Sequence, residues 1–236
     1  MELDTKYTAN RRHKLNIDYF ETIDCEAKAY WLGFLWADGG MSKTTKLASG
    51  YNRLTIAQHE KEYDHIVKFQ RAIECDYEIK QQPKHIVALD INSTPFCQHL
   101  EALGYARKDK RTNIPPMPTY LIRHFIRGYF DGDGCLSVYI QHVQQYNIRK
   151  QEWSLTGNRE FLINIAEILR LNVGVSNNVG IKEYKRTSKA ITIRYGKAAD
   201  VANLYHYMYD GATVYLESKH EKFMQFFENH PEYKSE

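Results

Sequence analysis

Two short segments of the sequence carry the residue types best suited to chemistry. Residues 31–39 read WLGFLWADG and residues 126–134 read IRGYFDGDG, and both end in an Asp-Gly pair. The aspartates of these pairs, Asp38 and Asp133, are 133 − 38 = 95 residues apart. Carboxylate oxygens are the ligands that Mg²⁺ prefers in proteins, whereas zinc is usually held by histidine and cysteine clusters. The sequence has no such cluster, so the paired aspartates predict a Mg²⁺ site.

Each aspartate is expected at the C-terminal end of a buried helix. Residues 29–37 are apolar on every side, which is typical of a helix with no face toward solvent. The helix dipole is negative at this end and disfavours an anion, so two such carboxylates brought together would call for a cation. We expect Gly39 and Gly134 to end the two helices in the left-handed conformation.

A glycine in the middle of each helix indicates that the two helices touch. Glycine costs a helix interior about 1 kcal/mol relative to alanine, and a small residue allows close backbone approach. Gly33 and Gly128 stand at matching places, so we expect the helices to pack against each other there. Parallel pairing would bring Asp38 and Asp133 to the same end. A single Asp-Gly is more simply a helix-ending turn, but its recurrence in twin helices favours the functional interpretation.

The chain around these segments also repeats. Each half is predicted to run helix, two strands, helix, two strands, helix, which indicates an α+β fold with antiparallel sheets. Strands are predicted near 41–48, 52–58, 77–82, 85–91, 135–142, 148–156, 176–183 and 190–195, and the helices between them near 60–73, 158–171 and 197–209, with one ending at residue 103. Thr94 is expected to cap that last helix and Gly104 to end it. These elements define an N-terminal extension (1–24), a first repeat (25–104), a linker (105–118) and a second repeat with a C-terminal helix (119–236).

Composition narrows the class of protein. The 236 residues contain 32 basic and 29 acidic side chains, and a net charge of +3 is too small to identify a nucleic-acid binder. The mean hydropathy of −0.59 and the lack of a long apolar run argue against a membrane protein, and the polar opening residues predict no secretory signal. We expect a cytoplasmic, organellar or phage-encoded protein. The cysteines at positions 25, 75, 97 and 135 form no C-x-x-C pair and are expected to be reduced core residues.

The two motifs and the repeated architecture resemble the monomeric LAGLIDADG homing endonucleases, over residues 25–227. The resemblance implies a monomer of two pseudo-symmetric αββαββα repeats whose antiparallel sheets form a DNA-binding saddle. It implies a site-specific endonuclease that cuts both DNA strands across the minor groove and leaves 3′ overhangs. The first motif departs from the family pattern at Trp36, where the second motif retains an acid, Asp131. That position is not a metal ligand in the family.

The resemblance also implies the composition of the metal site. Asp38 and Asp133, with Gly39 and Gly134 beside them, would hold two or three Mg²⁺ ions, for which Mn²⁺ is expected to substitute. The ions would activate a water and stabilise the leaving 3′ oxygen.

Three further residues are assigned to the site by the resemblance. A basic residue is expected near each active centre, at Lys108 in the first repeat and Lys219 in the second. A polar residue at the end of the second strand, Gln58, is expected to organise the attacking water. Its counterpart is Gly157, which has no side chain. Either the two sites differ and one strand is nicked faster, or Thr156 or a neighbouring residue substitutes for the missing side chain.

The sheet faces are expected to contact the duplex through basic and polar side chains that read phosphates and base edges. The residues predicted for this surface are Lys43, Lys46, Arg53, Lys80, Gln82, Lys84, Gln141, Arg149, Lys150, Lys182, Lys185, Arg186, Lys189 and Arg194. The same residue types are also typical of an ordinary solvated sheet face.

Other functions fit parts of the sequence. A non-cleaving binder on the same scaffold, such as an intron maturase or a transcription regulator, would be favoured by loss of an Asp-Gly carboxylate, and both carboxylates are present. A metal-dependent enzyme for a small phosphate ester would require a deep enclosed pocket. An intein nuclease would carry a splicing block with a nucleophile at each end, whereas this sequence begins with Met1 and shows none. We therefore expect double-stranded DNA, and no membrane, as the partner.

Overall fold

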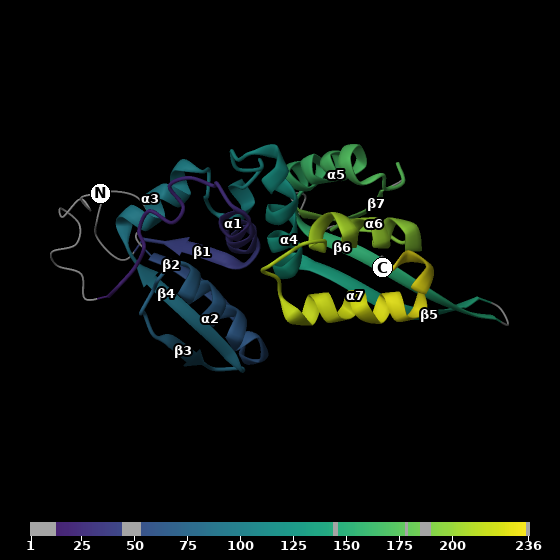
Figure 1. Ribbon diagram of the computed structural model, residues 1–236, viewed down its shortest axis with the longest axis horizontal. Helices are drawn as coiled ribbons and strands as arrows, with labels where there is room; N and C mark the ends of the chain where they lie inside the picture. The colour runs from purple at the N-terminus through teal and green to yellow at the C-terminus, as the bar shows by residue number, and fades with distance from the viewer. Residues whose placement is uncertain (1–12, 44–52, 144–145, 178, 185–189, 235–236) are drawn as a thin grey trace. The chain divides into compact units, whose positions relative to one another are not determined.

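The computed structural model describes residues 13–43, 53–143, 146–177, 179–184 and 190–234 (Figure 1). Its contacts divide the chain into two compact units, and each is described here by itself. The first comprises Met1–Thr22 and Gly40–Leu100, and the second Ile23–Gly39 and Glu101–Glu236. The helix that carries Asp38 therefore belongs to the same unit as Asp133.

The first unit is built on a four-stranded sheet with the order β1-β2-β4-β3. Its elements are β1 (Gly39–Ser42), β2 (Arg53–His59), the 3-10 turn η2 (Glu60–Glu62), α2 (Tyr63–Ala72), β3 (Ile79–Gln82), β4 (Ile86–Asn92) and α3 (Thr94–Ala102). The pairing of β2 with β4 sets Leu54 beside Ile91 and Ile56 beside Leu89, and all four side chains are buried. This face forms the core, and the alternate residues of both strands point away from it.

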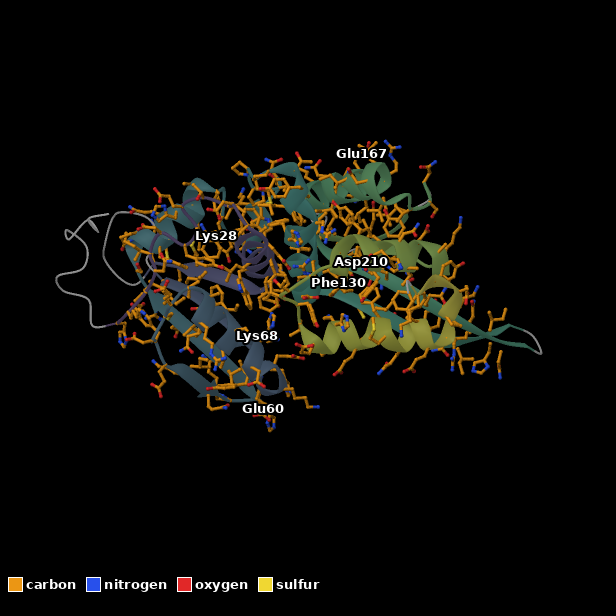
Figure 2. The ribbon with its side chains drawn as sticks, in the orientation of Figure 1. Lys28, Glu60, Lys68, Phe130, Glu167 and Asp210 are labelled. Carbon is orange, nitrogen blue, oxygen red and sulfur yellow. The ribbon has the colours of Figure 1, made fainter. Side chains whose placement is uncertain are left out.

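The second unit repeats that topology, with the sheet order β5-β6-β8-β7. Its strands are β5 (Gly134–Val143), β6 (Tyr146–Asn158), β7 (Gly180–Glu183) and β8 (Ala190–Tyr195). Its helices are α1 (Glu26–Asp38), α4 (Ile122–Asp133), α5 (Arg159–Val173), α6 (Ala198–Tyr209) and α7 (Glu217–Asn229), with 3-10 turns η3 (Lys108–Lys110), η4 (Thr119–Leu121) and η5 (Pro231–Tyr233). The ring of Phe130, labelled in Figure 2, stacks on Trp153 with 5.2 Å between ring centres and so joins α4 to the sheet. The two antiparallel sheets with their helices confirm the predicted α+β fold.

Among the described residues, no helix combines the length and apolar character needed to cross a membrane.

Local sequence signals explain where several helices begin and end. The Asn158 side chain caps α5 by accepting the backbone N–H two residues on, at 2.9 Å. The cap of α3 was wrongly predicted, because the Ser93 hydroxyl accepts the N–H of Phe96 at 3.4 Å while Thr94 is already helical. Gly104 follows that helix with φ of 88°, in the left-handed region expected of a glycine stop.

The prediction that all four cysteines lie in the core was wrong for three of them. All four are free thiols, but only Cys97 is buried, and Cys75 is half-buried. Cys25 precedes the first residue of α1, and Cys135 lies next to the start of β5 on the face away from the core, so both are exposed.

A buried carboxylate, Asp131, ties three elements of the second unit together. It accepts hydrogen bonds from the hydroxyl of Tyr30 in α1 at 2.7 Å and from the hydroxyl of Tyr209 in α6 at 2.5 Å. It also accepts the backbone N–H of Leu216, just before α7, at 2.7 Å. Despite these bonds, burial raises the pKa of Asp131 to about 6. The three hydrogen bonds join α4 to α1, to α6 and to the residue before α7.

The raised pKa of Asp131 predicts a specific pH dependence of stability. Between about pH 4 and pH 6 the folded chain binds more protons at this site than the unfolded chain, whose aspartates titrate near 3.9. The free energy of unfolding should therefore fall as the pH rises through this window, by about 3 kcal/mol in all, and stay at the lower value above it.

Urea denaturation of the wild type and of Asp131→Asn at a series of pH values isolates this contribution, because asparagine does not titrate. The difference between the two free energies of unfolding should change by about that amount between pH 4 and pH 7. A difference that is constant over the whole range would contradict the assigned pKa.

Candidate metal and nucleic-acid site

The two helices that bear glycines pack with their backbones in contact. A Cβ atom built on Gly33 of α1 would lie 2.0 Å from the carbonyl oxygen of Phe125, and one built on Gly128 of α4 would lie 2.0 Å from the carbonyl oxygen of Tyr30. Neither position can hold any side chain without separating the helices. The reciprocal contacts place equivalent turns of α1 and α4 side by side.

This packing brings the two aspartates to one end of the helix pair. Asp38 is the last residue of α1, and Asp133 is the last residue of α4. A Cβ atom built on Gly132 would lie 2.9 Å from Oδ2 of Asp38, so the Asp38 carboxylate contacts the residue that precedes Asp133. Burial, together with the nearby charges of Asp133 and Asp38, raises the pKa of the Tyr129 hydroxyl well above its usual value. The helices run parallel, and Tyr129 lies close to both carboxylates.

Asp133 is a partly buried carboxylate, and its neighbours do not fully offset the cost of burying its negative charge. Its side chain is 20% exposed, and Oδ2 lies 2.7 Å from Nζ of Lys108 in an ion pair that is not aligned as a hydrogen bond. Burial raises the pKa of Asp133, and the opposing effects of Lys108 and of the Tyr129 hydroxyl do not cancel that increase. A divalent cation next to this carboxylate would stabilise its charged form.

The position of Lys108 differs from the one predicted. Lys108 was predicted to lie at the site of the first motif, whereas its ammonium group contacts Asp133, the aspartate of the second motif. The linker that contains the 3-10 turn η3 carries it there.

Each glycine that follows an aspartate offers its carbonyl oxygen to a cationic side chain. Nζ of Lys219, in α7, donates to the carbonyl oxygen of Gly134. In the other half, Nη2 of Arg111 donates to the carbonyl oxygen of Gly39 at 2.9 Å. The Arg111 guanidinium is held in place by Tyr105, whose ring centre is 3.8 Å from Cζ. Arg111 is thus the structural counterpart of Lys219, and it was not predicted from the sequence, where it ends the basic run 107–111.

The expected left-handed conformation of Gly39 and Gly134 was wrong. Gly39 has φ −78° and ψ 143°, and Gly134 has φ −89° and ψ 162°, so both are extended and lead directly from helix to strand. Space requires glycine at these positions. A Cβ atom would lie 2.4 Å from the Tyr105 hydroxyl at Gly39 and 2.2 Å from the ring of Phe130 at Gly134.

Gln58 and Gly157 occupy matching places in the two sheets. Gln58 lies near the end of β2 in the first unit, and Gly157 near the end of β6 in the second. Each is followed by a residue, His59 or Asn158, whose side chain accepts the backbone N–H two residues further on. The shared cap fixes the alignment of the two strands independently of their sequences.

Most of the described residues predicted to contact DNA lie on the sheet faces opposite the core. In the first sheet, the pairing register places Arg53, Lys80 and Gln82 on that face. In the second sheet, the register places four predicted residues on one such face, namely Gln141, Lys150, Lys182 and Arg194. Lys43 and Lys84 are exposed next to strand ends. Lys46, Lys185, Arg186 and Lys189 lie outside the described residues.

Arg149 lies on the opposite sheet face from the other β-strand residues predicted to contact DNA. It neighbours Lys150 in β6, and consecutive strand residues point to opposite faces. Its guanidinium lies on the helix-covered face and donates to the side-chain oxygen of Asn229, the last residue of α7.

The donor atoms at the ends of α1 and α4 fit a hard cation. In the part of the chain that the structure describes, no three His, Cys, Asp or Glu side chains gather into one cluster. The ligands on offer are the carboxylates of Asp38 and Asp133 and the neighbouring carbonyl oxygens of Gly39 and Gly134, all of them oxygens. Mg²⁺ is commonly held by one or two carboxylates, with waters and substrate phosphates as its other ligands.

Comparisons with known proteins identify this architecture. Residues 121–208 match a family model described as a LAGLIDADG-like domain. The I-LtrWI LAGLIDADG homing endonuclease bound to target DNA aligns with a TM-score of 0.58 and 13% identity, over 89% of this chain and 90% of that one. The LAGLIDADG meganuclease I-CpaMI bound to uncleaved DNA aligns with a TM-score of 0.61 and 13% identity, over 85% and 89% of the two chains. I-SmaMI bound to an uncleaved DNA target with calcium ions aligns with a TM-score of 0.57 and 13% identity, over 87% of this chain and 93% of that one. None of the curated protein sequences matches the chain.

Proposed function

Because residues 121–208 form a LAGLIDADG-like domain in a chain with the fold of the LAGLIDADG homing endonucleases, we propose that this protein is a site-specific, metal-dependent DNA endonuclease. The observation that carries the proposal is the convergence of Asp38 and Asp133 at one end of the α1–α4 pair. The duplex would lie against the sheet faces opposite the core. Both strands would be cut across the minor groove, with 5′ phosphates and 3′ overhangs as products.

Each residue of the site has a separate task in this proposal. Asp38 and Asp133 would hold divalent ions, with the carbonyl oxygens of Gly39 and Gly134 beside them. Bound Mg²⁺ supplies an activated water and stabilises the leaving 3′ oxygen. Lys219 places a positive charge beside Gly134, where it would attract the scissile phosphate and stabilise the charge that develops on it.

Arg111 and Lys108 would have different effects on the two halves. Arg111 is a buried cation that fixes the end of α1 through the carbonyl oxygens of Trp36 and Gly39. Lys108 neutralises Asp133 before an ion binds, and it would then be free to contact the phosphate. Gln58 would orient the attacking water in the first half.

Cleavage of a randomised duplex library tests the proposal. With Mg²⁺ or Mn²⁺ the protein should select and cut a single long site, with 3′ overhangs, and EDTA should abolish cutting. Tight, selective binding without cutting in either metal would instead support a non-cleaving binder on the same scaffold, such as an intron maturase or a transcription regulator.

The opposite orientation of two adjacent basic residues gives a matched test of the DNA-binding face. Lys150 lies on the face away from the core, and Arg149 on the helix-covered face. Lys150→Ala should weaken binding and reduce the slope of log K against log salt concentration by about 1, because one phosphate contact is lost. Arg149→Ala should leave that slope unchanged. Equal slopes for both variants, measured by fluorescence anisotropy of a labelled duplex, would rule out the assigned face.

A further inference from the structure

Gly157 lacks a side chain because a residue from α4 occupies the space. A Cβ atom built on Gly157 would lie 2.2 Å from the hydroxyl oxygen of Tyr129 and 3.3 Å from its Cζ. The same hydroxyl donates to the carbonyl oxygen of Thr156 at 3.0 Å, which fixes its position against the strand. A hydroxyl group from the helix thus stands where the side chain of the strand residue would begin.

The two halves of the chain carry this polar group on different elements. Tyr129 follows Gly128 in the second motif, and its counterpart after Gly33 in the first motif is Phe34. Phenylalanine on the helix accompanies Gln58 on the strand in one half, and tyrosine on the helix accompanies Gly157 on the strand in the other. Each half therefore retains one uncharged polar side chain from the pair.

The Tyr129 hydroxyl is also close to the acidic end of its own helix. Its proton is donated to Thr156, and its oxygen is close enough to Asp133 that the charge of this carboxylate adds to the effect of burial in raising the pKa of Tyr129. Lys108 contacts the same carboxylate at 2.7 Å. Because burial keeps the Tyr129 hydroxyl protonated, it remains a hydrogen-bond donor over the whole ordinary pH range.

We propose that Tyr129 is the positioning residue of the second half of the active site, where its hydroxyl, fixed on the carbonyl oxygen of Thr156, takes the place of the strand glutamine. This inference rests on the proposed endonuclease function. The inference also changes the predicted difference between the two half-sites. The half with Gly157 does not lack a polar group, because the Tyr129 hydroxyl takes the place of the glutamine.

Removing the hydroxyl with Tyr129→Phe should slow the cutting of one DNA strand by roughly 10- to 100-fold, as for other residues that support a metal site without binding the ion. The other strand should be cut at the normal rate, so nicked duplex should accumulate. Mn²⁺ affinity of the DNA complex, measured by calorimetry, should weaken at one site only. Tyr195→Phe is the matched control, because this buried tyrosine of β8 packs on Trp153 and should change neither rate nor affinity.

A swap of the two residues provides the decisive comparison. In Gly157→Gln alone, the new side chain clashes with the Tyr129 hydroxyl, so this variant should be less stable than the wild type. The double variant Tyr129→Phe with Gly157→Gln has the combination found in the first half. It should restore cutting of the slowed strand.

Three outcomes would overturn the role of Tyr129. One is normal nicking of both strands by Tyr129→Phe, another is equal slowing of both strands, and the third is a folded double variant without rescue. If the unmodified protein binds a selected duplex but cuts none, the proposed function itself fails and the inference falls with it.

Discussion

Asp38→Asn and Asp133→Asn should each reduce double-strand cleavage by roughly 100-fold or more, because even residues that merely support a metal ligand cost 10- to 100-fold when lost. Asparagine keeps the shape of the side chain and removes the charge that would hold the ion. DNA affinity should change little, because the residues assigned to DNA contact lie on the sheet faces. Rates of plasmid cutting and binding isotherms for the same preparations measure both effects.

Asp131→Asn is the matched control for these variants. Asp131 lies on the same helix, two residues before Asp133, but its carboxylate is buried among the hydroxyls of Tyr30 and Tyr209 and the N–H of Leu216. This variant should change the pH dependence of unfolding and leave cutting intact. Cleavage that survives in both Asp38→Asn and Asp133→Asn would refute the assigned metal site.

The second large effect is on stability. Gly33→Ala and Gly128→Ala should each lower the free energy of unfolding by about 3 kcal/mol or more, at or beyond the upper end for overpacking, because the new methyl group meets a backbone carbonyl at 2.0 Å and not a movable side chain. The helices would have to separate, and Asp38 and Asp133 would separate with them. Urea denaturation measures the loss of stability.

Gly196→Ala is the control in the same unit. A Cβ atom at Gly196 meets only the carbonyl oxygen of Gln151, at 3.5 Å, which is an ordinary contact. Its stability should stay within about 0.5 kcal/mol of the wild type, as for most surface substitutions. A Gly128→Ala variant as stable as Gly196→Ala would show that α1 and α4 do not pack as described.

The fold was predictable because its local patterns repeat. Alternating apolar residues such as Ile191, Ile193 and Tyr195 identify a half-buried strand, and all three side chains are buried. The internal repeat then extends any assignment made in one half to the other. Chain order and short connections leave few ways to arrange such elements, so the α+β fold with two antiparallel sheets followed from the pattern.

Details that depend on exact orientation were not predictable. Lys108 and Arg111 lie in one basic run, and the 3-10 turn η3, which begins at Lys108 and ends just before Arg111, separates them. Lys108 reaches Asp133, whereas Arg111 reaches the end of α1. The faces of Arg149 and Lys150 depend on the strand register, which is set by pairing with β5 and not by the residues themselves. The spacing of residues in the sequence determines neither the contacts of Lys108 and Arg111 nor the sheet faces of Arg149 and Lys150.

The conformation of Gly39 and Gly134 illustrates a competing signal. A glycine after a helix usually marks a left-handed stop, but here the helices continue directly into β1 and β5 with extended backbone. The requirement for glycine comes from contacts with Tyr105 and Phe130, and such steric contacts arise only in the folded chain.

The most direct test of the metal site is the number of Mn²⁺ ions bound by the complex with the selected duplex, counted by electron paramagnetic resonance titration. The wild type should bind two or three ions, Asp38→Asn and Asp133→Asn should each bind fewer, and the double variant should bind none at this site. A double variant that binds the duplex and retains the wild-type number of ions would contradict the assignment of both carboxylates.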